Sequence, residues 1–234
     1  MTPAPDPPLE RSTKIRWGFV VVGTLVGLLV LLSVTPPAIR RPGINAAITA
    51  SAMQANGLHK ALMLYAHDHD GRFPEAMTNS NEAYRQLFPD YLQEERPFYV
   101  PRSAWHAAAR GQKSDNDIGS PPAFEEALEK GENYWAYVSG LGTQSDSQLP
   151  VIADGFVEGS PGTYTDDPSQ KGGVWKGTKA IVVLVSGATR AEPLSKSTGF
   201  RVWRRDPTTG TKVHIFQLPP PPEGAPPRNA LNPL

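Results

Sequence analysis

Cysteine is absent from the chain, so disulfide bonds, thiolate metal sites and thiol nucleophiles are all excluded. Neither sign of charge is in excess, because 23 basic residues balance 23 acidic ones, and the charge gives no reason to expect nucleic acid as a partner. The chain also lacks the Gly-Lys-Ser/Thr loop that holds phosphates and the Gly-x-Ser-x-Gly turn of serine hydrolases. With these signatures missing, we predict that the protein is not an enzyme.

Proline, in contrast, is abundant, with 25 residues that cluster at both ends of the chain. Proline cannot donate a backbone hydrogen bond, and these ends hold little apolar surface to bury. Residues 1–16 therefore read as a Pro-rich, basic tail, and residues 219–234 as a disordered Pro-rich tail.

Residues 17–35 form an uncharged apolar run. As a helix the run is roughly 28 Å long, about the thickness of the hydrocarbon core of a bilayer. It predicts a single-pass membrane anchor. The basic residues before it favour a cytoplasmic N-terminus, which leaves residues 43–218 as an extracytoplasmic domain. A cleaved signal peptide is the alternative, but its apolar core is shorter. Gly23 and Gly27 form a small-xxx-small pair suited to close contact between membrane helices.

A second helical pattern follows, with apolar residues spaced three or four apart. These residues are Ile44, Ile48, Ala52, Ala55, Leu58, Leu62 and Tyr65. Asn45, Gln54, Asn56 and Lys60 belong to the opposite face. The pattern predicts a long amphipathic helix that ends before the turn signal Asp70-Gly71.

From residue 133 the sequence pattern consists of short β-branched or aromatic runs separated by glycine, proline and asparagine. The runs fall at 134–138, 150–153, 179–185, 189–192, 200–204 and 212–218. The order of one long helix, short helices and then an antiparallel sheet predicts an α+β fold.

Three stretches resemble the type IV pilin-like proteins, including the pseudopilins of type II secretion and relatives of planctomycete and verrucomicrobia type. They are ANGLHKALMLYAHDHDGRFP (55–74), AYRQLFPDYLQEERPFYVPRSAW (83–105) and NYWAYVSGLGTQSDSQLPVIADG (133–155). The resemblance implies that the long helix packs on the C-terminal sheet. Prepilins are cut before a phenylalanine, which makes Gly18 and Phe19 the candidate leader-processing junction. The pattern departs at Gly23, which stands where the family has a glutamate.

The resemblance implies a membrane-anchored structural or assembly subunit of a type II secretion or type IV pilus-like system. Its expected partners are the lipid bilayer and sibling subunits that pack through the 44–65 helix. The alternative is a monomeric, tethered module that binds a sugar or a protein. Its sugar-binding surface would use exposed aromatic residues, although core filling is the more frequent role of such residues. The aromatic residues in question are Trp105, Tyr134, Trp135, Trp175 and Trp203.

No cofactor is expected, and Ca²⁺ is the only ion for which the sequence offers candidate ligands. Asp68 and Asp70 alternate before Gly71, as in the first half of a calcium loop, but Asn79 stands at the twelfth position, where a glutamate is needed. His67 and His69 have no visible third ligand for a transition metal. By resemblance, Ser145-Asp146 and Asp166-Asp167 are equal candidates. Glu125, Glu126, Glu129 and Glu132 are expected on a solvated face.

Overall fold

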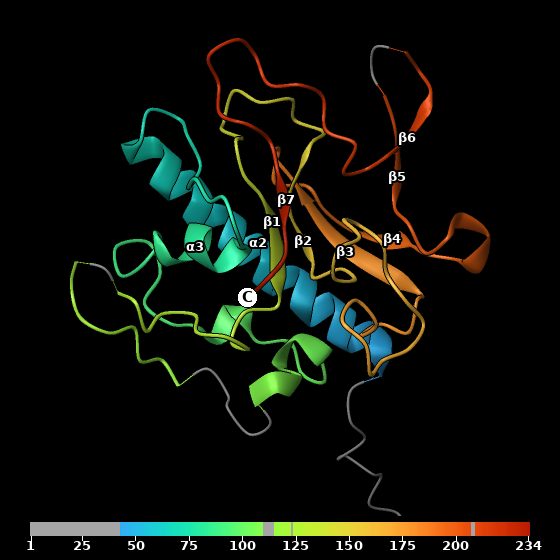
Figure 1. Ribbon diagram of the computed structural model, residues 1–234, viewed down its shortest axis with the longest axis horizontal. Coiled ribbons are helices and arrows are strands. Elements are labelled where there is room, and N and C mark those ends of the chain that lie inside the picture. The colour runs from blue at the N-terminus through green and yellow to red at the C-terminus, as the bar shows by residue number, and fades with distance from the viewer. Residues whose placement is uncertain (1–42, 110–114, 123, 207–208) are drawn as a thin grey trace, which may run out of the picture. The chain divides into compact units, whose positions relative to one another are not determined.

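The structure is a computed structural model that describes residues 43–234 apart from 110–114, 123 and 207–208. The predicted N-terminal tail (1–16) and the predicted anchor (17–35) lie outside the described residues. Among the residues that the structure describes, no helix combines the length and apolar character needed to cross a bilayer. Figure 1 shows the order of the elements.

The centre of the fold is a five-stranded antiparallel sheet in the order β4-β3-β2-β1-β7. Its strands are β1 (Trp135–Val138), β2 (Pro150–Asp154), β3 (Lys179–Leu184), β4 (Thr189–Pro193) and β7 (Ala230–Leu231). A separate hairpin pairs β5 (Trp203–Arg205) with β6 (Lys212–His214). The strand runs predicted from the sequence are thus confirmed in type, and only their ends differ by a few residues.

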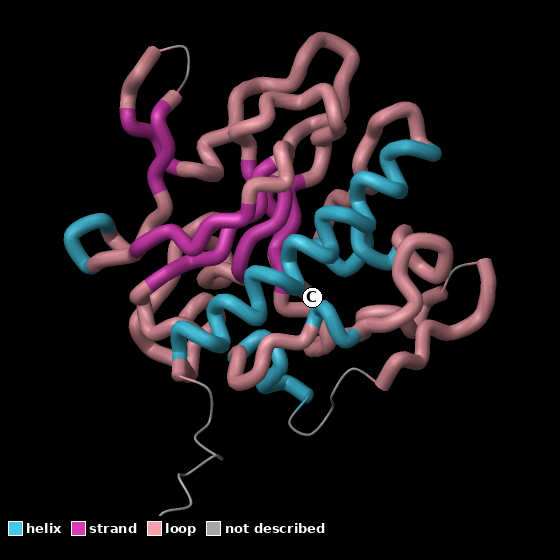
Figure 2. The backbone as a smooth tube through the Cα atoms, turned by 180° about the vertical axis from the view of Figure 1, so that it is seen from behind, coloured by secondary structure: helices cyan, strands magenta, loops and turns pink. Residues whose placement is uncertain are grey.

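The long helix α2 (Ile44–Asp68) crosses one face of this sheet, as Figures 1 and 2 show from opposite sides. Leu58 and Leu62 on the helix share one core with Ile181 and Val183 of β3, and all four are fully buried. The described residues therefore form an α+β fold, as the sequence predicts. Ile44, expected on the buried face, is 38% exposed because it is the first residue of the helix and has no turn before it.

The other face of the sheet is buried as well. Ala180, Val182 and Leu184 alternate with the α2-facing residues of β3 and pack under the segments that follow β2 and β4. Because both faces are covered, β2 and β3 read as nearly continuous apolar runs rather than as alternating ones.

The connections between α2 and the sheet are mostly irregular. Three short elements lie there, namely α3 (Ser80–Arg85) and the 3₁₀ helices η1 (Arg96–Phe98) and η2 (Ala104–Ala109), while a further 3₁₀ helix, η3 (Lys196–Thr198), follows β4. Asn79 caps α3, and its side chain accepts a hydrogen bond from the Glu82 backbone. Residues 124–130 form turns, with positive φ angles of 45° at Phe124 and 52° at Leu128.

The C-terminal segment differs most from expectation. Residues 219–234 were predicted to be a disordered tail, but Ala230 and Leu231 form β7 and pair with the free edge of β1. The Asn232 side-chain oxygen accepts a hydrogen bond from the Phe156 backbone. A proline removes only its own backbone donor from a strand. The proline-free segment 228–232 is therefore long enough to add an edge strand.

This docking predicts a steric effect at Gly140, in the loop after β1. Gly140 has φ of 74°, and a Cβ there would lie 2.5 Å from the Pro227 carbonyl oxygen. Gly159 has nearly the same φ, 72°, with open space around it. We expect Gly159→Ala to cost about 1 kcal/mol of unfolding free energy and Gly140→Ala about 3 kcal/mol, because overpacking adds to the backbone strain. Urea midpoints measure both variants, and equal losses would contradict the docked C-terminal segment.

Candidate functional site

The outward side of α2 carries an unusual surface, here called the outer strip. Its members are three or four residues apart and are all exposed: Ala46, Ala50, Met53, Gly57, Lys60, Leu64 and His67. Any surface helix has outward positions at this spacing, but they are normally charged. In the outer strip only Lys60 carries a fixed charge, while Met53 and Leu64 are 71% and 58% exposed. The strip is therefore an apolar and small-residue surface that faces solvent.

Polar contacts on the inner side fix the orientation of the helix. Nε2 of the buried His59 lies 3.0 Å from the Val185 carbonyl oxygen, and burial lowers the pKa of the imidazole. The Asn56 side chain, expected on the solvent face, donates 3.2 Å hydrogen bonds to the Gly187 carbonyl and the Thr189 hydroxyl. Because these bonds attach α2 to the β3–β4 turn, the outer strip is held in a fixed direction.

The structure does not bring the predicted ligands Asp68 and Asp70 into a metal-binding group. Asp68 accepts a 2.9 Å hydrogen bond from the Tyr91 hydroxyl. His69 stacks on the Tyr65 ring at 3.7 Å between centroids, and its Nδ1 lies 2.7 Å from the Tyr65 carbonyl. Among the described residues, the three-ligand group lies elsewhere, at Glu95, Asp115 and Glu132.

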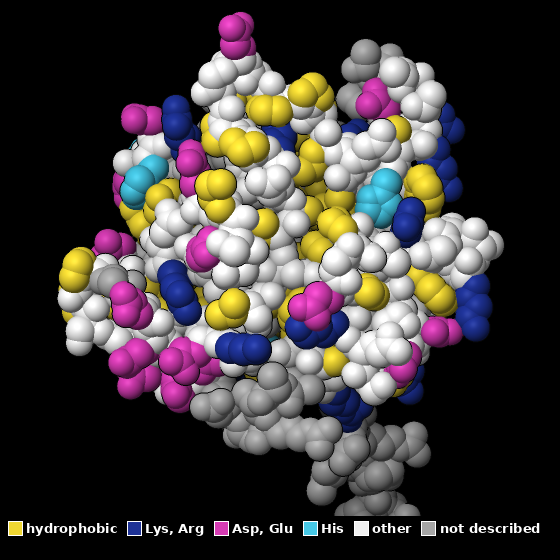
Figure 3. Space-filling view, in the orientation of Figure 1, with side chains coloured by type: hydrophobic (Ala, Val, Ile, Leu, Met, Phe, Trp, Pro, Cys, Tyr) yellow, Lys and Arg dark blue, Asp and Glu magenta, His cyan; other side chains and the backbone are white. Residues whose placement is uncertain are grey.

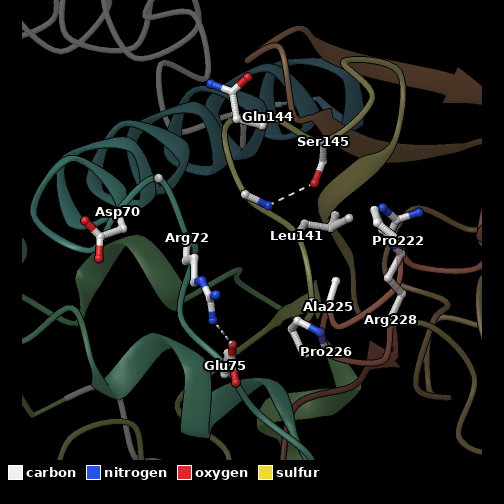
Figure 4. Close-up of a pocket in the computed structure, with 13 residues that line it drawn as sticks. Asp70, Arg72, Glu75, Leu141, Gln144, Ser145, Pro222, Ala225, Pro226 and Arg228 are labelled. Atoms are coloured by element: carbon white, nitrogen blue, oxygen red, sulfur yellow. Dashed lines mark hydrogen bonds and ion pairs between the residues drawn. The ribbon is translucent and has the colours of Figure 1, made fainter.

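Asp70 instead lines a cavity of about 230 Å³ between the end of α2, the β1–β2 loop and the C-terminal segment. Figure 4 shows that Arg72 and Glu75 face each other across part of its wall, as an exposed ion pair of 3.9 Å. The other cation of the cavity, Arg228, donates a 3.1 Å hydrogen bond to the Pro219 carbonyl.

The acidic group was missed in the sequence, where Glu132 was assigned to a solvated face. Glu132 is 4% exposed and Glu95 is 0% exposed, while Asp115 lies at the surface. One oxygen from each of the three carboxylates lies within 4.8 Å of the others. Burial, and then the neighbouring Glu95 carboxylate, raise the pKa of Glu132 to about 7. Only the tertiary fold buries these acids, so periodicity held no signal for them.

A second buried acid is Asp154, at the end of β2. It is fully buried, and its Oδ2 accepts hydrogen bonds from the Trp175 indole at 2.8 Å and the Ile181 backbone at 2.7 Å. Burial raises the pKa of this carboxyl to about 7. Trp175 belongs to the segment that leads into β3 and Ile181 to β3 itself, so Asp154 fixes the start of that strand and the segment before it.

The aromatic residues considered for sugar binding are mostly core residues. Trp105, Tyr134, Trp135 and Trp175 are between 0 and 5% exposed, and only Trp203 is 37% exposed. The Trp203 ring pairs with a cation of its own hairpin, since the Lys212 ammonium lies 5.3 Å from its centroid. Core filling, the role favoured from the sequence, is therefore confirmed for four of the five, and the described residues do not assemble the alternative sugar-binding surface.

The predicted processing junction, Gly18 and Phe19, and the predicted helix-contact pair, Gly23 and Gly27, lie outside the described residues. Comparisons with models of protein families, with curated protein sequences and with solved structures give no match. The functional argument therefore depends on the residues of this chain alone.

Proposed function

We propose that this protein is a membrane-anchored, pilin-like structural or assembly subunit of a type II secretion or type IV pilus-like system. The apolar run at 17–35 would hold it in a bacterial inner membrane, with the folded domain outside the cytoplasm. The long helix α2 begins at Ile44, a few residues after that run, and packs on an antiparallel sheet. This order of anchor, long helix and sheet supports the proposal.

The observation that carries the proposal is the outer strip. Covering exposed apolar side chains lowers the free energy by roughly 25 cal/mol for each Å² that is removed from water. Small residues at Ala46, Ala50 and Gly57 allow another helix to approach closely, and Met53 and Leu64 supply the area to bury. Because every helix face has this spacing, the apolar and small-residue composition of the strip is what indicates a seam with another helix.

A second copy of this chain is the occupant that we assign to the strip. A common anchor would confine the copies to one bilayer plane, so the effective concentration of each strip for another is high. The strip also lacks acids, and its one lysine is flanked by uncharged residues, so like strips meet with little repulsion. A monomeric tethered module would use this face for a different protein, and its strip would then not cross-link to a second copy.

Cysteine cross-linking tests the proposal cleanly, because the natural chain has no cysteine. Met53→Cys places a thiol in the outer strip, where the side chain is 71% exposed. Met77→Cys is the matched control, because that methionine is 78% exposed but belongs to the loop before α3. In native membranes treated with a mild oxidant, we expect at least tenfold more disulfide-linked dimer for Met53→Cys than for Met77→Cys.

For both variants, the yield of disulfide-linked dimer is measured on the full chain extracted in detergent. Equal dimer yields, or monomers only, would refute assembly through α2 and favour the tethered binding module. Intact-mass measurement of the same material separates a processed subunit that begins at Phe19 from a permanent anchor that retains Met1.

A further inference from the structure

Two glutamates that come from different loops lie side by side in the interior. Glu95 precedes η1, Glu132 precedes β1, and the surface residue Asp115 brings a third carboxylate to them. The two glutamates are 0% and 4% exposed, so water does not solvate their charges. Burial of an ionised carboxylate without a compensating charge costs several kcal/mol. A compensating group is therefore needed wherever both acids are ionised.

The described residues supply no such group. Oε1 of Glu95 accepts a 2.6 Å hydrogen bond from the Leu128 backbone, but Oε2 is buried and has no hydrogen-bond partner. The ion pairs of the described chain lie elsewhere, and none involves Glu95, Asp115 or Glu132. Arg85, which contacts the same loop, is bound to the Ala127 and Leu128 carbonyls.

The surroundings add negative charge instead of removing it. Asp115 and Asp117 act on Glu95 and raise the pKa of its carboxyl, beyond the larger effect of burial. The exposed acids of 115–117 and 125–129 belong to the surface at the lower left of Figure 3, where acidic side chains gather over the yellow-green loops of Figure 1. The site thus has the electrostatic character of a cation-binding site.

Backbone hydrogen bonds hold the carboxylates in place before any ion arrives. The Glu129 backbone donates a 2.7 Å hydrogen bond to Oε2 of Glu132. The Glu95 backbone donates a 3.0 Å hydrogen bond to the side-chain oxygen of Asn116, which joins the Asp115 loop to the buried glutamate. Such preorganisation reduces the entropy that a bound ion would have to offset.

We propose that Glu95, Asp115 and Glu132 form a Ca²⁺ site that joins the three loops in front of β1. All the ligand atoms are carboxylate oxygens, which suit Ca²⁺, Mg²⁺ or Mn²⁺ and not Zn²⁺ or Cu²⁺. The nearby His106 is not free to bind, since its Nε2 accepts from the Val100 backbone and its Nδ1 contacts the Gly131 carbonyl. Ca²⁺ accepts carboxylate oxygens in an irregular and flexible geometry, whereas Mg²⁺ requires a near-ideal octahedron and keeps several waters, so three carboxylates from three separate loops favour Ca²⁺.

This site is distinct from the calcium candidates considered in the sequence, Asp68 and Asp70, and does not depend on the proposed assembly function. It uses residues that neither the outer strip nor the anchor includes. Failure of one proposal therefore leaves the other standing.

Calorimetry and thermal unfolding on the full-length protein in detergent test the site. After removal of bound ions with EGTA, CaCl₂ should bind with a stoichiometry of one and a Kd of about 10⁻⁴ M, the range of extracellular modules. At a hundredfold excess over Kd, Tm should rise by about 5 °C or more. MgCl₂ at the same concentration should bind at least tenfold more weakly.

Three variants locate the site. Glu132→Gln keeps the oxygen that accepts from the Glu129 backbone, and Asp115→Asn changes an exposed residue and keeps an oxygen for the Asp117 backbone. Each should weaken Ca²⁺ binding at least tenfold, while the exposed neighbour variant Glu94→Gln should bind as the natural chain does. The proposal is overturned by an absence of binding at about 10 mM Ca²⁺, by equal binding of Mg²⁺, or by unchanged binding in Asp115→Asn. A proton shared by the two glutamates would instead give stabilisation by Glu132→Gln with no response to Ca²⁺.

Discussion

Replacing Asn133 with alanine should lower the free energy of unfolding by about 4 kcal/mol, because the amide satisfies several buried groups at once. The Asn133 side chain donates to the Ser80 hydroxyl at 2.9 Å and to the Asn81 side-chain oxygen at 3.0 Å. Its own oxygen accepts a 2.8 Å hydrogen bond from the Trp135 backbone. All four residues are 0% exposed, so water cannot replace the lost partners.

Urea denaturation followed by tryptophan fluorescence measures the loss. Gln144→Ala is the control, since this exposed amide has no structural role in the described chain and should change stability by less than about 0.5 kcal/mol. A loss below about 1 kcal/mol for Asn133→Ala would mean that the network relaxes around the cavity, and the role assigned to the amide would be wrong.

The same network explains how remote segments are held together. Asn81 donates from its amide to the Leu128 carbonyl and accepts a 3.1 Å hydrogen bond from the Leu234 backbone. Leu128 in turn donates its backbone N–H to Glu95. One buried amide therefore links the C-terminus to the loop that carries the acidic group.

Local patterns in the sequence were sufficient for the elements that hold the core. Apolar spacing of three and four residues predicts α2, and its predicted end is confirmed because Asp70 and Gly71 adopt positive φ angles of 52° and 78°. Short β-branched runs predict the central strands, since β-branched side chains fill a sheet that is buried on both faces.

Features that depend on pairing between distant segments were not predictable. Ala230 and Leu231, which lie far away in sequence, pair with the edge of β1. Their segment is rich in proline, so its composition predicts no strand there. Glu132 becomes a buried acid only in the tertiary fold, which also brings Glu95 beside it from far away in sequence. The outer strip was not predicted because the helical pattern was used to identify the inner, buried face. Met53 and Leu64 belong to the opposite face, where polar residues are expected.

A pH-dependent stability that disappears in Asp154→Asn is the second large effect that we expect. Burial raises the pKa of the folded carboxyl from 3.8 to about 7. Between these values the folded protein holds a proton that the unfolded chain has released, so this proton's contribution is complete below pH 3.8 and is lost as pH rises to about 7. A difference of about three pKa units corresponds to about 4 kcal/mol.

Asparagine is the appropriate replacement because it cannot ionise and keeps one carbonyl oxygen for the Trp175 indole and the Ile181 backbone. The natural protein and Asp154→Asn should therefore be similarly stable near pH 4, and Asp154→Asn should be more stable than the natural protein by about 4 kcal/mol at pH 8. The buried imidazoles of His59 and His106, whose pKa values burial lowers, titrate alike in both proteins and cancel in the comparison. Urea midpoints at several pH values measure the difference. A constant difference from pH 4 to pH 8 would show that Asp154 is ionised throughout, and that hydrogen bonds to its carboxylate outweigh the cost of burying the charge.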